Sequence, residues 1–337
     1  MHAQNRYFEP LVPAAVAPTG VAEPARTPRL GIVVPCFNET EVLPETSRRL
    51  TALLDRLIAS GQVARGSQIV YVDDGSRDGT WQLIEILSQA DERIGGIKLS
   101  RNRGHQNALL AGLFTVDADV LISVDADLQD DIDVMSDMLT SFSKGAHVVY
   151  GVRKDRTSDG FFKRATAQGF YCAIRALGVE SVYNHADFRL MSRDAVAALK
   201  KFGEVNLFLR GIVPLLGYRS DIVYYTRSER FAGVSKYPLR KMLALALDGV
   251  TSFSVVPLRF ITAVGFVVFL ASVAMGMWTL WVRLFTDDAV PGWTSTLLPI
   301  YFLGGIQILC IGILGEYLGK VYQETKQRPR FIIEKLL

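Results

Sequence analysis

Apolar residues along the first two thirds of the chain alternate between two spacings, one typical of buried strands and one typical of helices. Short apolar runs of strand length occur at 30–34, 68–72, 97–99, 120–124 and 147–150. Helical spacing occurs at 43–58, 80–90, 106–115 and 132–143. Strands that alternate with helices predict an α/β domain over 29–232, with a mostly parallel, Rossmann-like sheet and helices on both of its faces.

Two long segments nearer the C-terminus contain no charged residue, at 260–282 and 289–315. Each is longer than the roughly 20 residues that a membrane-spanning helix needs. Basic residues such as Arg259 and Lys320 flank the pair on its outer sides. The positive-inside rule therefore predicts a two-helix transmembrane hairpin over 259–319, with spans at about 260–282 and 296–316. The α/β domain and both termini would lie on the cytoplasmic side, and 320–337 would be a cytoplasmic tail.

Two other segments have a different character. Residues 233–258 mix basic and apolar side chains, which predicts interfacial amphipathic helices on the bilayer surface, with an ordinary packed helix as the alternative. Residues 1–28 are rich in proline and alanine, without the continuous apolar core of a signal peptide. We expect this segment to be a disordered tail.

Composition narrows the class of protein. The chain has 337 residues with 37 Lys+Arg against 34 Asp+Glu, a formal net charge of +3. This near balance argues against a nucleic-acid partner, since such proteins carry a clear basic excess. The three cysteines, Cys36, Cys172 and Cys310, are odd in number and far apart, which disfavours a disulfide framework or a structural zinc site.

Polar residues collect where the predicted strands end, which is where parallel sheets bind ligands. These residues are Pro35, Asn38 and Glu39 after the first strand, Asp73, Asp74 and Ser76 after the second, and Asp125, Asp127 and Gln129 after a later one. One acidic turn alone is usually a helix cap, but three at successive strand ends point to a ligand site. No GxGxxG motif follows any strand, which disfavours a dinucleotide.

Asp125 and Asp127 are one residue apart, on either side of Ala126, directly after an apolar strand. Two carboxylates in this arrangement can converge on a hard cation, and Mg²⁺ or Mn²⁺ commonly joins protein carboxylates to substrate phosphates. The expected ligand is a nucleoside diphosphate, whose base or ribose Asp73 could bind. A solvated turn is the alternative for this motif taken alone.

Six motifs together carry a resemblance to a known family. They are PCFNE at 35–39, DDGSRDGT at 73–80, SRNRGH at 100–105, DADLQ at 125–129, DFRL at 187–190 and RFAGVSKY at 230–237. With the apolar hairpin, they resemble family 2 glycosyltransferases of GT-A fold, specifically the bactoprenol glucosyltransferases and dolichol-phosphate-mannose synthases. The resemblance covers about residues 30–330. Asp131-Ile132 departs from it, since the family more often has prolines there, and this affects a helix start.

The resemblance implies a role for each matching residue. Asp127, Gln129 and Asp187 would be catalytic, and Asp125 and Asp127 would bind Mg²⁺ or Mn²⁺. The nucleotide sugar would be bound by Pro35, Asn38, Glu39, Asp73, Asp74, Ser76, Arg103, Asp125, Ala126 and Asp127. Apart from the resemblance, a dianionic acceptor phosphate needs cations, and the residues we expect to bind it are Arg153, Arg164, Arg189, Arg230, Ser235 and Lys236. The cations that follow the strand at 147–150 could equally form a solvated face.

The reaction implied is transfer of a sugar from a nucleotide sugar to a polyprenyl phosphate such as undecaprenyl phosphate, with inversion at the anomeric carbon. A phosphate monoester is largely dianionic at neutral pH, so the nucleophile needs no strong base. Asp187 could therefore act as a base, orient other groups, or pair structurally with Arg189 or Arg193. His105 is expected to cap or pack, with a donor contact as the alternative.

The resemblance favours UDP-glucose as donor and the bacterial cytoplasmic (inner) membrane as location. A homo-oligomer such as a tetramer and a sugar-lipid flippase partner are compatible with it. Two other functions stay open: a processive polysaccharide synthase and a non-catalytic membrane scaffold or translocation partner. The first usually carries an Arg-Trp motif, and none of the four tryptophans here follows an arginine. The three intact aspartates, Asp125, Asp127 and Asp187, argue against the second.

Overall fold

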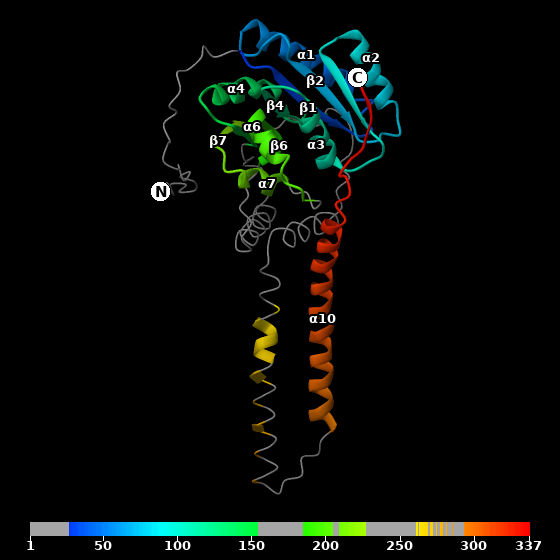
Figure 1. Ribbon diagram of the computed structural model, residues 1–337, viewed down its shortest axis with the longest axis vertical. Helices are drawn as coiled ribbons and strands as arrows, with labels where there is room; N and C mark the ends of the chain where they lie inside the picture. The colour runs from blue at the N-terminus through cyan, green and yellow to red at the C-terminus, as the bar shows by residue number, and fades with distance from the viewer. Residues whose placement is uncertain are drawn as a thin grey trace.

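The computed structural model describes residues 27–153, 185–204, 209–226 and 293–337, together with 263–268 and scattered positions between 261 and 285. Figure 1 shows one layered domain and a long helix, 293–325, which begins far from the domain and leads the chain back to it before the C-terminus. The predicted tail at 1–28 and the predicted amphipathic region at 233–258 lie almost wholly outside the described residues.

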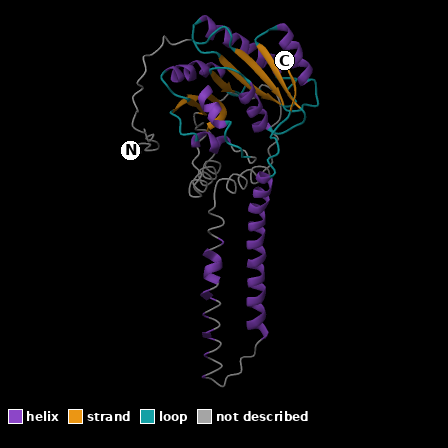
Figure 2. Ribbon diagram, viewed as in Figure 1, coloured by secondary structure: helices purple, strands orange, loops and turns teal. Residues whose placement is uncertain are grey.

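The domain is built on one sheet of eight strands in the order β7-β5-β6-β4-β1-β2-β3-β8 (Figure 2). The strands are β1 (Leu30–Cys36), β2 (Gln68–Asp73), β3 (Ile94–Leu99), β4 (Val120–Ser123), β5 (Val148–Arg153), β6 (His185–Ser192), β7 (Ser220–Tyr225) and β8 (Ile333–Leu336). The helices are α1 (Leu43–Ala59), α2 (Thr80–Ala90), α3 (His105–Thr115), η1 (Ile132–Val134), α4 (Met135–Ser143), α6 (Arg193–Leu199), α7 (Leu209–Leu215) and α10 (Trp293–Thr325). The α/β class predicted from the sequence is therefore confirmed.

The sheet is mixed rather than mostly parallel. Strands β4, β1, β2 and β3 run parallel to one another, and β5 runs parallel to β7. Strand β6 lies antiparallel between β4 and β5, and β8 lies antiparallel to β3. The sequence pattern did not reveal β6 because Asp187 and Arg189 interrupt its apolar run, and both side chains belong to the site described below.

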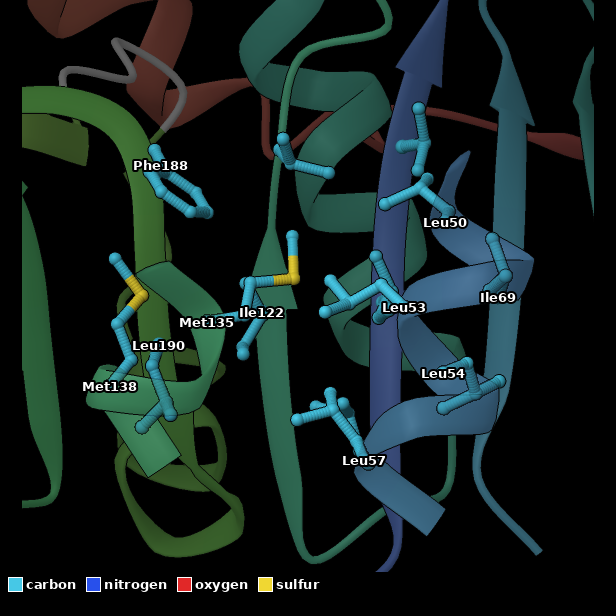
Figure 3. Close-up of a cluster of buried hydrophobic side chains, with 14 of the residues drawn as sticks. Leu50, Leu53, Leu54, Leu57, Ile69, Ile122, Met135, Met138, Phe188 and Leu190 are labelled. Atoms are coloured by element: carbon cyan, nitrogen blue, oxygen red, sulfur yellow. The ribbon is translucent and has the colours of Figure 1, made fainter. Parts of the chain in front are cut away.

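Each face of the sheet is covered by helices that bury an apolar cluster. On one face, Leu50, Leu53, Leu54 and Leu57 of α1 point toward the sheet, beside Met135 and Met138 of α4 (Figure 3). On the other face, α3, α6 and α7 pack their apolar residues against the sheet. The leucine spacing read from the sequence thus identified the buried face of α1 correctly.

The C-terminal region differs from the expected tail at 320–337. Helix α10 continues through Thr325, and the chain then adds β8 to the free edge of β3. The Leu337 N–H donates to the Gly96 carbonyl at 2.9 Å, and Lys335 forms an ion pair with Glu85 at 2.7 Å. This short strand carries Glu334 and Lys335 in its middle, as edge strands often do, so it gave no apolar signal.

Among the residues that the structure describes, no helix combines the length and the apolar character needed to cross a membrane. The predicted span at 260–282 falls largely outside the described residues, and the one at 296–316 lies within α10.

Removing residues 332–337 should destabilise the domain by about 1–3 kcal/mol, because β3 loses its hydrogen-bonded neighbour and Ile333 leaves the apolar cluster. For a domain of this size the melting temperature should fall by roughly 3–10 °C. A thermal melt of the full-length protein with and without these residues measures the change.

The matched control is the double variant Glu334→Gln, Lys335→Gln, which keeps strand β8 and removes only its charges. Exposed ion pairs contribute little, about 0–1 kcal/mol each, so this variant should melt close to the unaltered protein. An unchanged melting temperature after the deletion would contradict a structural role for β8.

Candidate active site

The loops that follow β1 and β2 are joined by their polar side chains. The Asn38 backbone N–H donates to Ser76 Oγ at 3.0 Å, and the Arg77 N–H donates to Asn38 Oδ1 at 2.9 Å. Asn38 has a φ of 57°, a left-handed conformation that asparagine tolerates better than most residues. These contacts bring together the segments predicted to bind the nucleotide, which come from separate strand ends.

Asp73, the last residue of β2, is fully buried. Its Oδ1 accepts the Ser76 N–H at 3.1 Å, while Oδ2 is buried without a hydrogen-bond donor among the described residues. Burial raises the pKa of this carboxyl. A buried acceptor without a donor is costly, so Asp73 fits the predicted role of accepting a hydrogen bond from a base or ribose.

Asp74 has a supporting position that the sequence did not reveal. Its Oδ1 accepts the Arg103 N–H at 2.7 Å and its Oδ2 accepts the Gly104 N–H at 2.8 Å. Gly75 approaches the same loop so closely that a Cβ there would lie 2.5 Å from the Asn102 nitrogen. Asp74 was predicted to contact the nucleotide sugar, and in the structure both of its oxygens hold the loop that carries Arg103.

The DADLQ turn follows β4. Asp127 Oδ1 accepts the Gln129 N–H at 3.2 Å, and the intervening Leu128 has a φ of 57°. Ala126 is buried in the core. Its carbonyl accepts a hydrogen bond from the Thr46 hydroxyl of α1 at 2.8 Å, which anchors the turn to that helix. Gln129 is also buried, and its Oε1 has no donor among the described residues. After the turn, Asp131 Oδ1 accepts the Asp133 N–H and begins η1, so the departure from the family pattern does fall at a helix start.

Three side chains from different elements meet beside this turn. His105, at the start of α3, places Nε2 3.4 Å from Asp125 Oδ1 and 3.7 Å from Asp187 Oδ2. His105 therefore bridges two predicted site residues and does more than cap its helix. Burial, together with the charges of Asp187, Asp130 and Asp127, raises the pKa of Asp125 to about 6, although His105 acts in the opposite direction.

The environment of Asp125 and Asp127 tests whether the site fits a divalent cation. Within the described ranges, no three His, Cys, Asp or Glu side chains are arranged to hold a metal ion. The donors at the turn are carboxylate oxygens, and the charges of Asp187, Asp130 and Asp127 add to burial in raising the pKa of Asp125. This set fits Mg²⁺ or Mn²⁺, which take few protein ligands and complete their shells with water and substrate phosphates. Asp125 and Asp127 are the residues that would hold it.

Asp187 lies among positive charges that oppose the effect of its burial. Arg210 Nη2 lies 3.4 Å from Oδ2, and Arg189 Nη2 lies 3.9 Å from Oδ1. Burial alone would raise the pKa of Asp187, but Arg210, Arg189 and His105 together lower it below the ordinary value. The lowered pKa of Asp187 makes it a weaker base than a carboxylate whose pKa is raised toward the working pH.

Arg210 was missed in the sequence, where it follows an apolar stretch without a recognised motif. The structure places it at the start of α7, which is joined to α3 because the Leu209 N–H donates to Gln106 Oε1 at 3.0 Å. The one sequence feature that could have identified Arg210 was its position as a lone arginine at the start of an apolar helix. The predicted pairing of Asp187 with Arg189 is present, whereas Arg193 instead forms an ion pair with Asp117 at 2.8 Å.

The predicted acceptor-binding residues are only partly described. Arg189 is buried, lies 5.6 Å from the Tyr150 ring centroid, and keeps Nε and Nη2 without hydrogen-bond acceptors in the described part of the chain. Arg153 contacts Asp130, with Nη2 3.3 Å from Oδ1. Arg164, Arg230, Ser235 and Lys236 lie outside the described residues, and their roles stay predictions.

Residues 31–199 match the model of glycosyl transferase family 2, and residues 256–321 match that of the GtrB C-terminal hairpin. The chain belongs to glycosyl transferase family 2. It is therefore a glycosyltransferase, and its mixed α/β sheet is GT-A-like. The family predicted from the six motifs is confirmed.

Individual relatives agree over most of the chain. It is 50% identical over 309 residues to an uncharacterized glycosyltransferase, YkoT, of Bacillus subtilis, which covers 91% of each chain. It is 40% identical over 312 residues to the prophage bactoprenol glucosyl transferase homolog of Escherichia coli, covering 91% of this chain and 99% of the relative. A solved structure of glucosyl-3-phosphoglycerate synthase from Mycobacterium tuberculosis superposes with a TM-score of 0.42 at 18% identity, covering 66% of this chain and 76% of that one.

Asp74→Asn should destabilise the protein by about 1–3 kcal/mol, because the amide nitrogen cannot accept the N–H of Arg103 or Gly104, and one of these partly buried hydrogen bonds to a carboxylate is lost. Chemical denaturation measures the loss. Asp117→Asn is the control, since Asp117 is exposed and its ion pairs with Arg29 and Arg193 contribute little. Equal stabilities of the two variants would refute the supporting role of Asp74.

Proposed function

We propose that this enzyme transfers a sugar from a nucleotide sugar to a polyprenyl phosphate, with glucose from UDP-glucose as the first candidate. The observation that carries the proposal is the joining of the DADLQ turn to Asp187 through His105, with Arg189 and Arg210 beside them. An acidic turn beside two arginines suits a reaction in which a diphosphate leaves and a phosphate attacks. The relative in Escherichia coli, whose name includes bactoprenol glucosyl transferase, supports the lipid acceptor.

On the donor side, Asp73 accepts a hydrogen bond from the base or ribose, with its free Oδ2 as the acceptor. Asn38 and Ser76 hold the adjoining loops around the nucleotide. Asp125 and Asp127 hold Mg²⁺ or Mn²⁺, which when bound neutralises charge that develops on the leaving diphosphate. Gln129, whose Oε1 has no donor among the described residues, contacts the donor sugar.

On the acceptor side, a phosphate oxygen attacks the anomeric carbon from the face opposite the leaving diphosphate, which gives inversion. Because a phosphate monoester is largely dianionic at neutral pH, the site needs cations more than a base. Asp187 has a lowered pKa, which makes it a weak base, and it contacts two arginines. Asp187 thus orients Arg189 and Arg210 toward the acceptor phosphate.

The proposal places the catalytic domain at the cytoplasmic face of a bacterial inner membrane. The uncharged runs at 260–282 and 289–315 and the match to a hairpin family over 256–321 support a two-helix anchor. An anchored site suits a lipid whose phosphate stays at the interface, and the segment at 233–258 would lie there. The homo-oligomer and the flippase partner stay predictions.

A transfer assay tests the reaction directly. Purified full-length protein is incubated with undecaprenyl phosphate, Mg²⁺ or Mn²⁺, and a panel of labelled UDP- and GDP-sugars. We expect label from UDP-glucose in the organic phase, lost on addition of EDTA. Label in a water-soluble polymer would favour a polysaccharide synthase, and no transfer from any donor would favour a scaffold.

Asp127→Asn should reduce transfer at least about 100-fold, since substitutions of mere outer-shell partners of metal ligands already cost 10- to 100-fold. The variant should fold, because an asparagine Oδ1 can still accept the Gln129 N–H. The initial rate at saturating donor measures the effect, with the exposed Asp133→Asn as control. Near-normal turnover of Asp127→Asn would remove this residue from the metal site.

A further inference from the structure

A buried polar network beside the DADLQ turn has no role in the chemistry described above. Asp130, the residue after Gln129, is buried, and its Oδ1 accepts the Tyr225 hydroxyl at 2.5 Å. The same oxygen accepts Arg153 Nη2 at 3.3 Å, and Arg153 Nε donates to the Tyr225 hydroxyl at 3.1 Å. The three side chains form a closed set of contacts, and none was recognised as a network from the sequence.

The network fixes the turn to the far half of the sheet. Arg153 and Tyr225 are the last residues of β5 and β7, and they are register partners in that parallel pair. Asp130 is bound to both, and it is linked through Gln129 to Asp127, whose Oδ1 accepts the Gln129 N–H. The turn cannot shift away from the sheet without breaking these hydrogen bonds.

Tyr225 also reaches the strand that carries Asp187. Its ring packs edge-on against Phe188, with centroids 5.4 Å apart and planes at 88°. Phe188 in turn leaves no room at Gly151 of β5, where a Cβ would lie 2.8 Å from the phenylalanine ring. Tyr225 thus contacts both Asp130, which follows the DADLQ turn, and Phe188, the β6 residue between Asp187 and Arg189.

The network is poorly explained as a device for stability. Asp130 Oδ2 is buried without a donor among the described residues, and an incompletely satisfied buried carboxylate lowers stability. Buried ion pairs are often no better than apolar replacements of similar volume. What the arrangement does supply is a fixed geometry, which a metal and diphosphate site requires of its supporting side chains.

We propose that Asp130 and Tyr225 are positioning residues, which hold Asp127 and Gln129 in the geometry that binds a divalent cation together with a nucleoside diphosphate. The inference rests on the proposed function and adds to it two residues that touch neither substrate nor metal. Their effect is transmitted through the turn, so it should appear first in the binding of the cation and nucleotide.

The test is the binding of Mn²⁺ together with UDP to the full-length protein, measured by calorimetry without turnover. Tyr225→Phe removes one hydroxyl and leaves the ring packing on Phe188, so the protein should fold. We expect it to weaken binding about 10-fold, the lower end of the usual effect of outer-shell partners. Tyr224→Phe is the matched control, since the neighbouring tyrosine is exposed on the same strand, and it should bind within about twofold of the unaltered protein.

Asp130→Asn supplies a second variant, with the exposed Asp133→Asn as its control. It should also weaken binding, and the double variant with Tyr225→Phe should lose less than the product of the single losses, because both changes act on the same Asp130–Tyr225 hydrogen bond. In the transfer assay, the donor KM should rise by a similar factor while kcat changes less than about threefold.

Normal Mn²⁺–UDP binding by both Tyr225→Phe and Asp130→Asn would overturn the proposal, as would an equal loss in the Tyr224→Phe control. If both variants melted at a lower temperature but bound Mn²⁺–UDP normally, the network would contribute only to stability and the proposal would be wrong. If the unaltered protein binds no Mn²⁺–UDP, both this inference and the proposed donor fall. If the unaltered protein binds Mn²⁺–UDP and transfers sugar, and both variants do so equally well, only this inference fails.

Discussion

Negative charge buried at one edge of the sheet is the constraint around which the site is organised. A carboxylate removed from water is costly unless it is paired or hydrogen-bonded. Asp74 is satisfied by two backbone N–H groups, and Asp187 by two arginines. Asp125 has His105 Nε2 at 3.4 Å, and its pKa stays raised at about 6, first through burial and then through the charges of Asp187, Asp130 and Asp127. A divalent cation held by Asp125 and Asp127 would offset the negative charge of both carboxylates.

The rigidity of this edge comes from backbone conformations that few residues adopt easily. Asn38 and Leu128 both have a φ of 57°, and Gly75 has a φ of 67° where it meets the loop at 101–102. Such positions persist only where their surroundings hold them. Here the surrounding contacts are the Ser76 and Arg77 bonds to Asn38, the Gln129 bond to Asp127 and the Thr46 bond to Ala126. The loops are therefore shaped before any ligand arrives, which lowers the cost of binding it.

Local patterns allowed most of the first half of the fold to be predicted. The strands β1 to β5, the helices between them and the residues after β1, β2 and β4 all follow from apolar spacing and polar strand ends. The antiparallel strands β6 and β8 could not be found in this way, because charged residues interrupt both. Arg210 and Tyr225 were missed for a different reason. Their roles depend on which strands become neighbours, and the order β7-β5-β6-β4 is a property of the whole sheet.

Arg210, which the sequence analysis missed, also affects what Asp187 can do. A general base works best with a pKa near the working pH. The arginines beside Asp187 lower its pKa instead, and an ion pair with Arg210 is lost if the carboxylate takes up a proton. Proton transfer to Asp187 would thus release Arg210 at the moment when a phosphate oxygen needs that arginine in place. A carboxylate that stays ionised and keeps its arginines in place is compatible with a nucleophile that already carries its own negative charge.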